Sequence, residues 1–488
     1  MTSGRNAMTA IGQSAINGPS AGAAAPIAMN ARPKSQPVPD VAATRTRLAI
    51  PVVIFMFCIV FPIGANVGSL AVTSLRLYLM IMVIPLSISL LAGRYGKIMA
   101  IDVLFFLHIS LATVALAVNN PTQVLQQIGS VGAEFFGGYL IGRAYIRKPS
   151  DFVALAKLLI TLVLLSFPFA LFETMTGRPL ILELIRKIPG ATTVAFNIQA
   201  GRLGLEKVQM TFAHPIHYGL FCAVAFPLGF VGLKGNLSTP IRYLTSTITG
   251  LCGFLALSSG ALLAVLLQIC LISWAWIFNR VQRRWLLLLG MFAFLYVVID
   301  ILSNRTPIEV FMSYATFSAH TAYWRSIIFE WGMKNVWANP WLGIGLNEWV
   351  RPYYMYSGSM DNFWLVMAVR YGIPSFLCLA IGYAIALWKI GRRDFSANTN
   401  LGNLRRAWMF SFCGLTFTLT TVHVWTNIYS FVFFMFAAGL WMITAKSDPD
   451  DVNRDGLPES GGDVVPLVSA RQSTYTRFPQ KPARRPLD

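Results

Sequence analysis

The sequence is poor in charge. Asp, Glu, Lys and Arg make up 12% of its 488 residues, where soluble globular proteins carry about 25%. Hydrophobic residues reach 55%, and the mean hydropathy is +0.59. These values exclude an ordinary soluble protein. Because a hydrocarbon core of about 30 Å needs roughly 20 apolar residues per helix, they predict an all-α polytopic membrane protein.

The sequence also lacks cysteine patterns that bind metals or exchange disulfides. All six cysteines lie in apolar runs, which is typical of packing residues. The first 46 residues lack the apolar core of a cleaved signal peptide. We predict disordered cytoplasmic tails at 1–46 and 446–488, around a transmembrane domain at 47–445.

The apolar runs predict about twelve membrane spans. They cover residues 47–66, 70–92, 97–117, 126–144, 152–172, 211–233, 243–258, 260–279, 285–302, 361–388, 407–424 and 427–445.

The distribution of Lys and Arg predicts the orientation. Alternate loops, on the side of the N-terminus, hold fifteen of these residues, whereas the short loops 118–123 and 258–260 on the other side hold none. The positive-inside rule therefore puts both termini in the cytoplasm. Two long connections, 173–210 and 303–360, then face the periplasm. The net charge of +19 is explained by orientation, so we predict no nucleic-acid partner.

The first long connection gathers cations and histidines. Arg202, Lys207, His214 and His217 occur in GRLGLEKVQMTFAHPIHYG. A planar guanidinium suits bidentate binding of phosphate or diphosphate. The histidines could act as a base, as hydrogen-bond donors or as plain interfacial side chains. No carboxylate or cysteine joins them at ligand spacing, so we predict no metal and no cofactor. Residues 178–188 read as an interfacial amphipathic helix or as a solvated connector.

The second connection is rich in aromatic residues, and six of the thirteen tryptophans lie in 303–364. Residues 320–336 read as an amphipathic helix that Asn339-Pro340 ends, and PWLGIG follows, where two glycines permit a tight turn or a close approach to a ligand. Tryptophan rings could pack on sugar faces or anchor the loop at the membrane interface. The candidate substrate-binding residues here are His320, Trp324, Trp341 and Arg351.

Some ionisable residues fall inside predicted spans, where charge is expensive and functional by default. Arg76, Asp300 and Arg370 lie near the outer ends of their spans. Snorkelling or pairing, for example of Arg370 with Asp361, is the alternative reading. Asp102 and Glu134 read as structural, the latter in a Gly-rich span suited to close helix packing.

Several motifs together resemble the O-antigen ligase and O-antigen polymerase superfamily, bacterial inner-membrane enzymes with about twelve spans. They are Arg202 with the downstream Phe212-Ala213-His214-Pro215, the break SSGALLAVLLQ at 258–268, Tyr323-Trp324-Arg325, and Asn339 to Gly345. The resemblance covers roughly residues 45–445.

The resemblance implies a metal-independent glycosyltransferase of the C-type membrane architecture, whose donor is a glycan on polyprenyl diphosphate at the periplasmic face. By position, Arg202 and Arg325 would hold the diphosphate. The family often has His-Asn where this chain has Asp361-Asn362, so Asp361 would be the base, with His214 or His320 as substitutes. Asn362 and Arg370 join the substrate-binding set. The family's Ser-Arg is here Ser258-Ser259.

Three functions are consistent with these features. The first is polymerisation of lipid-linked repeat units into exopolysaccharide or O-antigen, and the second is ligation of a finished glycan to lipid A core or to a protein. The third, a flippase or other transporter, is disfavoured because no internal repeat is present and the polar groups collect at the outer face. The expected partners are polyprenyl-diphosphate-linked donor and acceptor glycans, the lipid bilayer, and flippase and chain-length or export proteins.

Overall fold

The computed structural model describes residues 47–67, 70–197, 201–304, 310, 319–396 and 398–446. The predicted tails lie outside these residues, Lys446 apart. Within these described residues, eight helical segments are long and apolar enough to cross a membrane, which confirms a polytopic helical membrane protein. They are α2 (Ser74–Leu91), α3 (Ala100–Asn119), α6 (Pro149–Thr176), α8 with η3 (Pro215–Gly232), α10 (Ser259–Ile277), α11 (Arg284–Leu302), α14 (Phe363–Gly391) and α16 with η4 (Thr426–Ile443).

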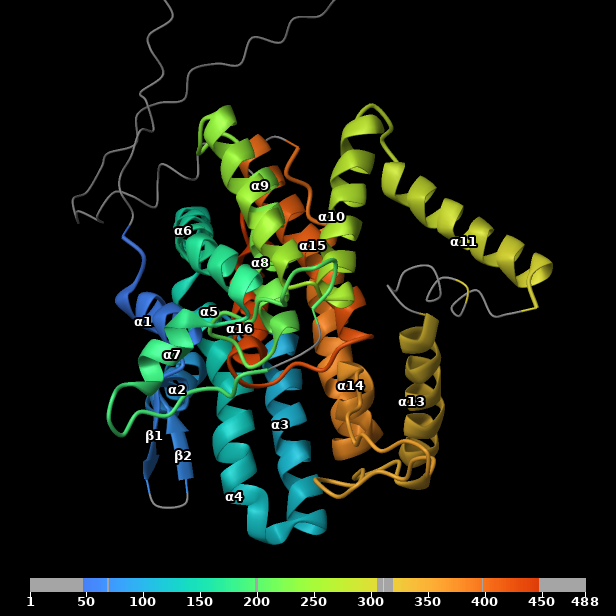
Figure 1. The fold of residues 1–488 in the computed structure, drawn as a ribbon. Coiled ribbons are helices and arrows are strands. Elements are labelled where there is room, and N and C mark those ends of the chain that lie inside the picture. Colours follow the sequence, from blue (N-terminus) through green and yellow to red (C-terminus); the bar gives the residue numbers. More distant parts are fainter. Residues whose placement is uncertain are drawn as a thin grey trace, which may run out of the picture. The chain divides into compact units, whose positions relative to one another are not determined.

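The other four predicted spans also contain helices, but these are shorter or less apolar. They are α1 (Ile50–Val60), the continuous run of α4 (Val124–Gln127), η2 (Ile128–Gly137) and α5 (Gly138–Tyr145), α9 (Thr239–Leu255) and α15 (Thr399–Leu419). The total of twelve therefore stays a prediction. Among the described residues of the two long connections, the structure shows the helices α7 (Leu180–Arg186) and α13 (Ala319–Ala338) (Figure 1).

The all-α prediction is wrong at one place, between the first two spans. Strands β1 (Gly64–Val67) and β2 (Leu70–Thr73) form an antiparallel hairpin there. Pro62 cannot continue a helix because it has no N–H, and α1 ends at Val60. The next helix starts where the Thr73 hydroxyl accepts a hydrogen bond from Arg76 N at 3.3 Å. The predicted spans 47–66 and 70–92 are thus too long at their facing ends.

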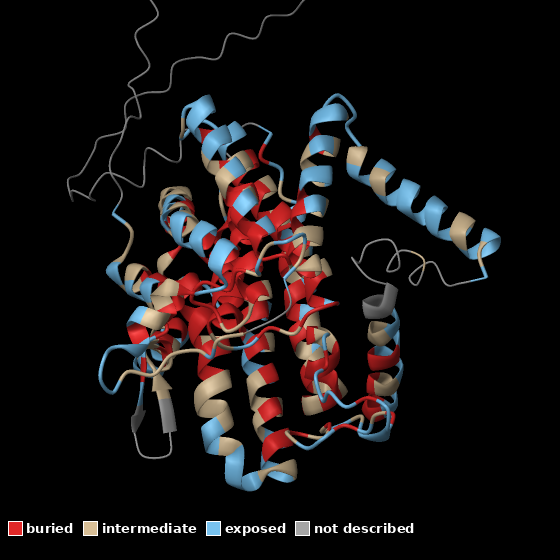
Figure 2. Ribbon diagram, viewed as in Figure 1, coloured by how far each residue is buried: buried red, intermediate tan, exposed pale blue. Residues whose placement is uncertain are grey.

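Most residues of α8 and α16 are buried, whereas none of α11 is (Figure 2). Helix α16 packs against α5 and η2, and α8 packs against α9, α10 and α15. At Gly142 a Cβ would lie 2.4 Å from the carbonyl oxygen of Phe434, so only glycine permits this approach of α5 to α16. The Gly-rich span therefore packs closely, as its sequence predicts. Asp300, on α11, is exposed.

The buried carboxylates Asp102 and Glu134 have structural partners, as predicted. Glu134 Oε1 lies 2.8 Å from Arg76 Nε. Asp102 pairs with Arg143 at 3.4 Å and accepts a hydrogen bond from the Tyr139 hydroxyl. Charge inside the helical core is therefore compensated by charge or by a hydroxyl donor.

Helix α14 is interrupted at Gly372, whose φ is +80°. The interruption frees backbone carbonyls, and those of Val369 and Arg370 accept hydrogen bonds from Ile344 N and Gly345 N, both at 2.9 Å. Gly343 has a φ of +60°, and a Cβ there would lie 2.4 Å from the Val369 carbonyl oxygen. The glycines of PWLGIG thus make a tight turn that docks on protein backbone, and the second long connection is fixed to α14 beside Arg370.

Candidate active site

Arg202 ties the first long connection to the break between α9 and α10. It lies in a tight turn in which Arg202 N and Leu205 N each donate to the other residue's carbonyl oxygen, at 2.8 and 3.0 Å. Its Nη1 donates to the Leu257 carbonyl oxygen at 3.1 Å. That carbonyl is available because α9 ends at Leu255 and α10 begins only at Ser259. The Ser-rich break seen in the sequence therefore holds a predicted catalytic arginine.

Glu173 at the end of α6 anchors the segment that follows. Its Oε1 accepts a hydrogen bond from Gln209 N at 2.7 Å, and its Oε2 accepts one from Met210 N at 3.0 Å. The Gln209 side chain in turn accepts from Asn197 N at 2.6 Å and donates to the Phe212 carbonyl oxygen at 3.1 Å. These bonds fix the chain between Lys207 and His214.

Backbone strain is concentrated in the same loops. Among the described residues, those with positive φ other than glycine are Leu203, Met210, Leu257 and Thr426. Leu203 lies in the Arg202 turn, Leu257 accepts the Arg202 hydrogen bond, Met210 donates to Glu173, and Thr426 follows Trp425. Such conformations cost about 1–3 kcal/mol each and persist where the surroundings enforce them, often at functional sites.

His214 caps the N-terminus of α8. Its Nδ1 accepts a hydrogen bond from Ile216 N at 3.1 Å, so in the neutral ring the proton is on Nε2. Burial and the charge of Lys207 lower the pKa of His214, against the opposing charge of Asp361. A neutral ring protonated at Nε2 is a hydrogen-bond donor. This geometry disfavours His214 as a base.

His217 and His423 meet at Trp425. His217 is fully buried, and its ring lies edge-on to the indole with centroids 4.2 Å apart. His423 is stacked on the same indole at 6.0 Å. Both ring nitrogens of His217 and Nδ1 of His423 are buried without a hydrogen-bond partner of normal geometry among the described residues. Buried polar atoms without a hydrogen-bond partner are uncommon in folded proteins.

Helix α13 carries Arg325, which lies near Asp361. The side chain is half-buried, and Nε is buried without a partner among the described residues. Burial lowers the pKa of the guanidinium, and the charge of Asp361 opposes that shift. Asp361 precedes α14, is exposed, and accepts a hydrogen bond from the Ser359 hydroxyl at 2.7 Å. Asp361 is therefore close enough to act electrostatically on both Arg325 and His214.

The electrostatic contacts join the two long connections. Burial and the charge of Arg202 lower the pKa of Lys207. The charge of Lys207 in turn contributes to the lowered pKa of His214. Burial lowers the pKa of His423 to about 3, with a further contribution from Arg370. Pairwise electrostatic effects thus connect four cationic side chains from distant parts of the sequence with the histidines and the Asp361 carboxylate; the four are Arg202, Lys207, Arg325 and Arg370. This arrangement is suited to an anionic ligand.

The structure gives Asn362 a structural role. Its Oδ1 accepts a hydrogen bond from Leu365 N at 3.0 Å, which caps α14. Arg351 pairs with Glu348 and donates from Nε to the Met355 carbonyl oxygen at 3.1 Å. Both side chains are therefore engaged within their own segment, and their predicted substrate contacts stay predictions.

The remaining predicted residues lie on or after α13. Trp324 packs near Tyr354, with ring centroids 6.2 Å apart. Trp341 is 76% exposed, which leaves its ring face available either for a sugar or for the membrane interface. His320 is the second residue of α13, but its side chain lies outside the described residues.

Sequence reasoning missed His423 and Trp425. The segment TTVHVWTN at 420–427 separates two apolar runs, and its parity puts it on the same predicted face as the two long connections. Its position between two apolar runs could have indicated an outer loop. The segment is short and carries no full charge, so it was not considered as part of the site. The described residues contain no group of three His, Cys, Asp or Glu side chains that could hold a metal ion.

Comparison with known protein families identifies part of the chain. Residues 244–380 match the family model of O-antigen ligase, and no curated protein matches the sequence. The matched region runs from α9 to α14 and includes Arg325, Asp361 and Arg370, whereas Arg202 and the α8 histidines precede it. The match confirms that residues 244–380 carry the domain of the O-antigen ligase and O-antigen polymerase superfamily.

Proposed function

We propose that the protein polymerises oligosaccharide repeat units linked to polyprenyl diphosphate, at the periplasmic face of the bacterial inner membrane. The observation that carries the proposal is the electrostatic connection of Arg202 and Lys207, from the first long connection, with Arg325 of the second and with Asp361 directly after it. A donor with a diphosphate leaving group presents several negative charges. Guanidinium groups hold such a group in both its bound and its departing form.

The proposed reaction is a glycosyl transfer. A hydroxyl oxygen of the acceptor sugar attacks the anomeric carbon of the donor, and a new glycosidic C–O bond forms. The bond between the anomeric carbon and the diphosphate oxygen breaks, and the electron pair leaves with the polyprenyl diphosphate. Arg202 and Arg325 stabilise the negative charge that develops on that oxygen. The hydroxyl proton passes to a base of the protein.

We assign the base role to Asp361. Its carboxylate accepts one described side-chain hydrogen bond, from the Ser359 hydroxyl, and it lies near Arg325, which would hold the leaving group. His214 has its Nδ1 engaged as a helix cap, so it serves as a donor from Nε2 to a sugar hydroxyl or to a phosphate oxygen. The exposed Trp341 ring supplies an apolar face for a sugar.

Ligation is the second candidate function, and the match of residues 244–380 to the O-antigen ligase model favours it. The chemical step is the same, and the two reactions differ in the acceptor. A polymerase uses a second polyprenyl-diphosphate glycan, whereas a ligase uses a hydroxyl of lipid A core or of a protein.

The test uses purified full-length protein in phosphatidylcholine liposomes, without an ion gradient, with a synthetic polyprenyl-diphosphate repeat unit. A ladder of longer lipid-linked glycans is the expected product of a polymerase. Transfer of glycan only when lipid A core or an acceptor protein is added would identify a ligase. A deletion strain that still makes long polymer but leaves it unattached would also contradict polymerisation. Movement of the donor across the bilayer without bond formation would contradict both and support a flippase.

A further inference from the structure

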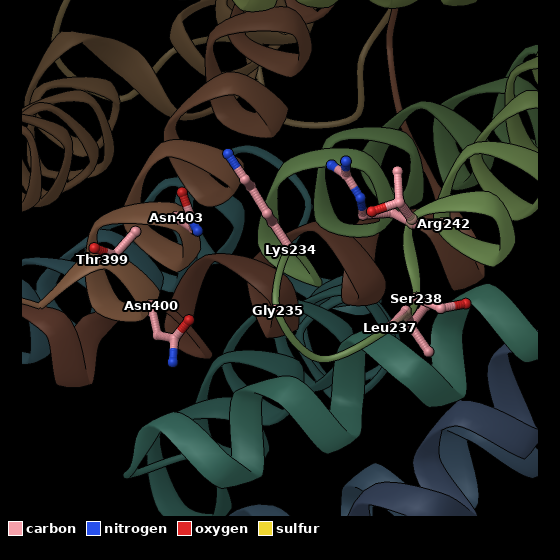
Figure 3. A pocket seen from close by; sticks show the side chains of 9 residues that line it. Lys234, Gly235, Leu237, Ser238, Arg242, Thr399, Asn400 and Asn403 are labelled. Carbon is pink, nitrogen blue, oxygen red and sulfur yellow. The ribbon is translucent and has the colours of Figure 1, made fainter. Parts of the chain in front are cut away.

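A polar cavity of about 350 Å³ lies between the start of α9 and the start of α15. Figure 3 shows its two sides. One is formed by the turn from Lys234 to Ser238 and the first residues of α9, and the other by Thr399, Asn400 and Asn403 of α15. None of these residues takes part in the candidate active site.

The cavity and the candidate active site are at opposite ends of the same two helices. Helix α9 runs over 17 residues from the cavity to the segment where Leu257 accepts the Arg202 hydrogen bond. Helix α15 runs over 21 residues from the cavity toward His423. At 1.5 Å per residue these helices span about 25 and 31 Å, which is close to the thickness of a hydrocarbon core. The proposed glycosyl donor therefore does not reach the cavity with its diphosphate.

Two cationic side chains line the cavity. Lys234 is exposed, and Arg242 is 8% exposed. The Arg242 guanidinium is held in place because Nη1 donates to the Phe230 carbonyl oxygen and because its charge lies over the rings of Phe230 and Tyr243, at 5.3 and 5.0 Å. The described lining contains no carboxylate. A fixed guanidinium beside an exposed ammonium is a suitable environment for an oxyanion.

The start of each helix adds further donors. At α9, Ser238 occupies the capping position but its hydroxyl makes no capping hydrogen bond, so the hydroxyl remains able to donate to a ligand. At α15, Asn398 caps Leu401 N at 3.1 Å, and the amides of Thr399 and Asn400 belong to the first turn, which has no partners within the helix. Both helix dipoles present their positive ends to the cavity.

The surroundings of the cavity are also positive. Arg406 donates from Nη2 to Asn403 Oδ1 at 2.7 Å, and so orients an amide that lines the cavity. Burial and the charge of Arg284 lower the pKa of Arg406, and burial together with the charge of Arg406 lowers the pKa of Arg405. These guanidinium groups therefore repel one another, and an anion bound nearby would relieve that repulsion.

We propose that this cavity binds a phosphate-bearing anion, either as the head group of an anionic lipid or as free phosphate. The cavity, its two cations, the unused Ser238 hydroxyl and the two helix starts all suit a phosphate group. Basic pockets between membrane helices are known sites for anionic head groups. The proposal does not depend on the proposed glycosyl transfer.

The experiment uses the full-length protein in a zwitterionic detergent. One arm adds phosphatidylglycerol or phosphatidylcholine and counts the retained lipids by native mass spectrometry. The other adds inorganic phosphate or chloride at equal ionic strength and measures the Tm. The variants are Lys234→Glu, on an exposed turn, and Asn400→Asp, which is nearly isosteric and favourable in the first turn of a helix. Lys389→Glu, an equal charge reversal at an exposed residue outside the cavity, is the matched control.

We expect the wild type and Lys389→Glu to bind, and both cavity variants to bind at least tenfold more weakly. Retention of phosphatidylglycerol that the cavity variants lose identifies a lipid head group. A rise in Tm with inorganic phosphate that they lose identifies free phosphate. Equal binding by all four proteins, equal retention of phosphatidylcholine, or no binding by the wild type would overturn the proposal. Because Asn400→Asp favours its helix, loss of binding in that variant cannot be attributed to unfolding if its Tm without ligand is unchanged.

Discussion

The edge of the His217 ring meets the indole of Trp425, with centroids 4.2 Å apart. This contact joins the first turn of α8 to the segment between α15 and α16, and His423 lies on the same indole. Two histidines far apart in the sequence thus share one aromatic partner, and the charge of Arg370 acts on one of them, His423. The contact therefore connects the first long connection with the segment that carries His423.

The buried His423 should make the protein sensitive to acid. Its pKa is about 3 in the folded protein, against an ordinary 6.5. Between these values the unfolded chain binds a proton that the folded chain excludes, so stability falls as the pH drops below about 6.5. At about pH 5 this one group costs about 2 kcal/mol. The Tm of His423→Phe, which keeps a ring beside Trp425, should therefore fall less than that of the wild type between about pH 7 and pH 5.

His423→Gln is a second variant without the titrating ring, and its Tm should show the same weaker dependence on pH. Equal pH dependence in the wild type and both variants would contradict the assignment.

Arg202→Ala and Arg325→Ala should each lower glycosyl transfer by about 100-fold or more, because each removes a donor to the leaving group. Arg325→Lys should recover only part of the loss, since an ammonium cannot make the bidentate contact. The measurement is the turnover of a polyprenyl-diphosphate donor by purified protein, with membrane levels checked in parallel. Lys334→Ala changes an exposed cation on the same helix, paired with Glu330 at 2.7 Å, and should retain activity. Full activity of both alanine variants would show that these arginines do not belong to the active site.

Asp361→Asn should lower the rate of the chemical step by about 10²–10⁴-fold, because general base catalysis contributes about that much. His214→Ala should cost less, since the ring is assigned a donor role. Single-turnover measurements with excess enzyme separate the chemical step from substrate binding. A larger loss in His214→Ala than in Asp361→Asn would reverse the assignment of the base.

The ion pair between the half-buried Arg76 and the buried Glu134 allows a test of stability alone. Arg76→Leu leaves the Glu134 carboxylate buried without its partner at 2.8 Å, and removing one member of such a pair costs about 3–5 kcal/mol. The double variant Arg76→Leu/Glu134→Gln should recover much of that loss because no charge remains. The Tm in detergent reports both effects. A double variant less stable than Arg76→Leu would show that the pair is needed as an ion pair.

Much of the fold could be predicted from the sequence, because hydropathy and helix-ending residues act locally. The helix predicted at 320–336 is observed as Ala319–Ala338, and it ends at Asn339-Pro340 as expected. The amphipathic helix predicted at 178–188 is observed as Leu180–Arg186. The β-hairpin was missed because its residues continue the apolar run, and only Pro62 interrupts the helix.

The candidate active site was predicted less completely, because proximity between distant segments is not visible in a single sequence. Arg202 and Arg325 were found by residue type and motif. The role of His214 as a cap depends on the ring orientation, and the place of His423 depends on how α15 and α16 pack. The docking of Gly345 on Arg370 likewise depends on the break in α14.

The interruption of α14 at Gly372 restricts the number of residues in the first half of that helix. The first half of α14 is held at both ends, where Phe363 N donates to the Val422 carbonyl oxygen at 3.1 Å and Ile373 N donates to the Pro340 carbonyl oxygen at 2.7 Å. One inserted residue would rotate everything after it by about 100° and shift it by about 1.5 Å. Arg370 would then turn away from His423 while Asp361 stayed in place. The segment between Phe363 and Ile373 therefore has a fixed length. Related sequences can differ in its side chains but should neither gain nor lose a residue there.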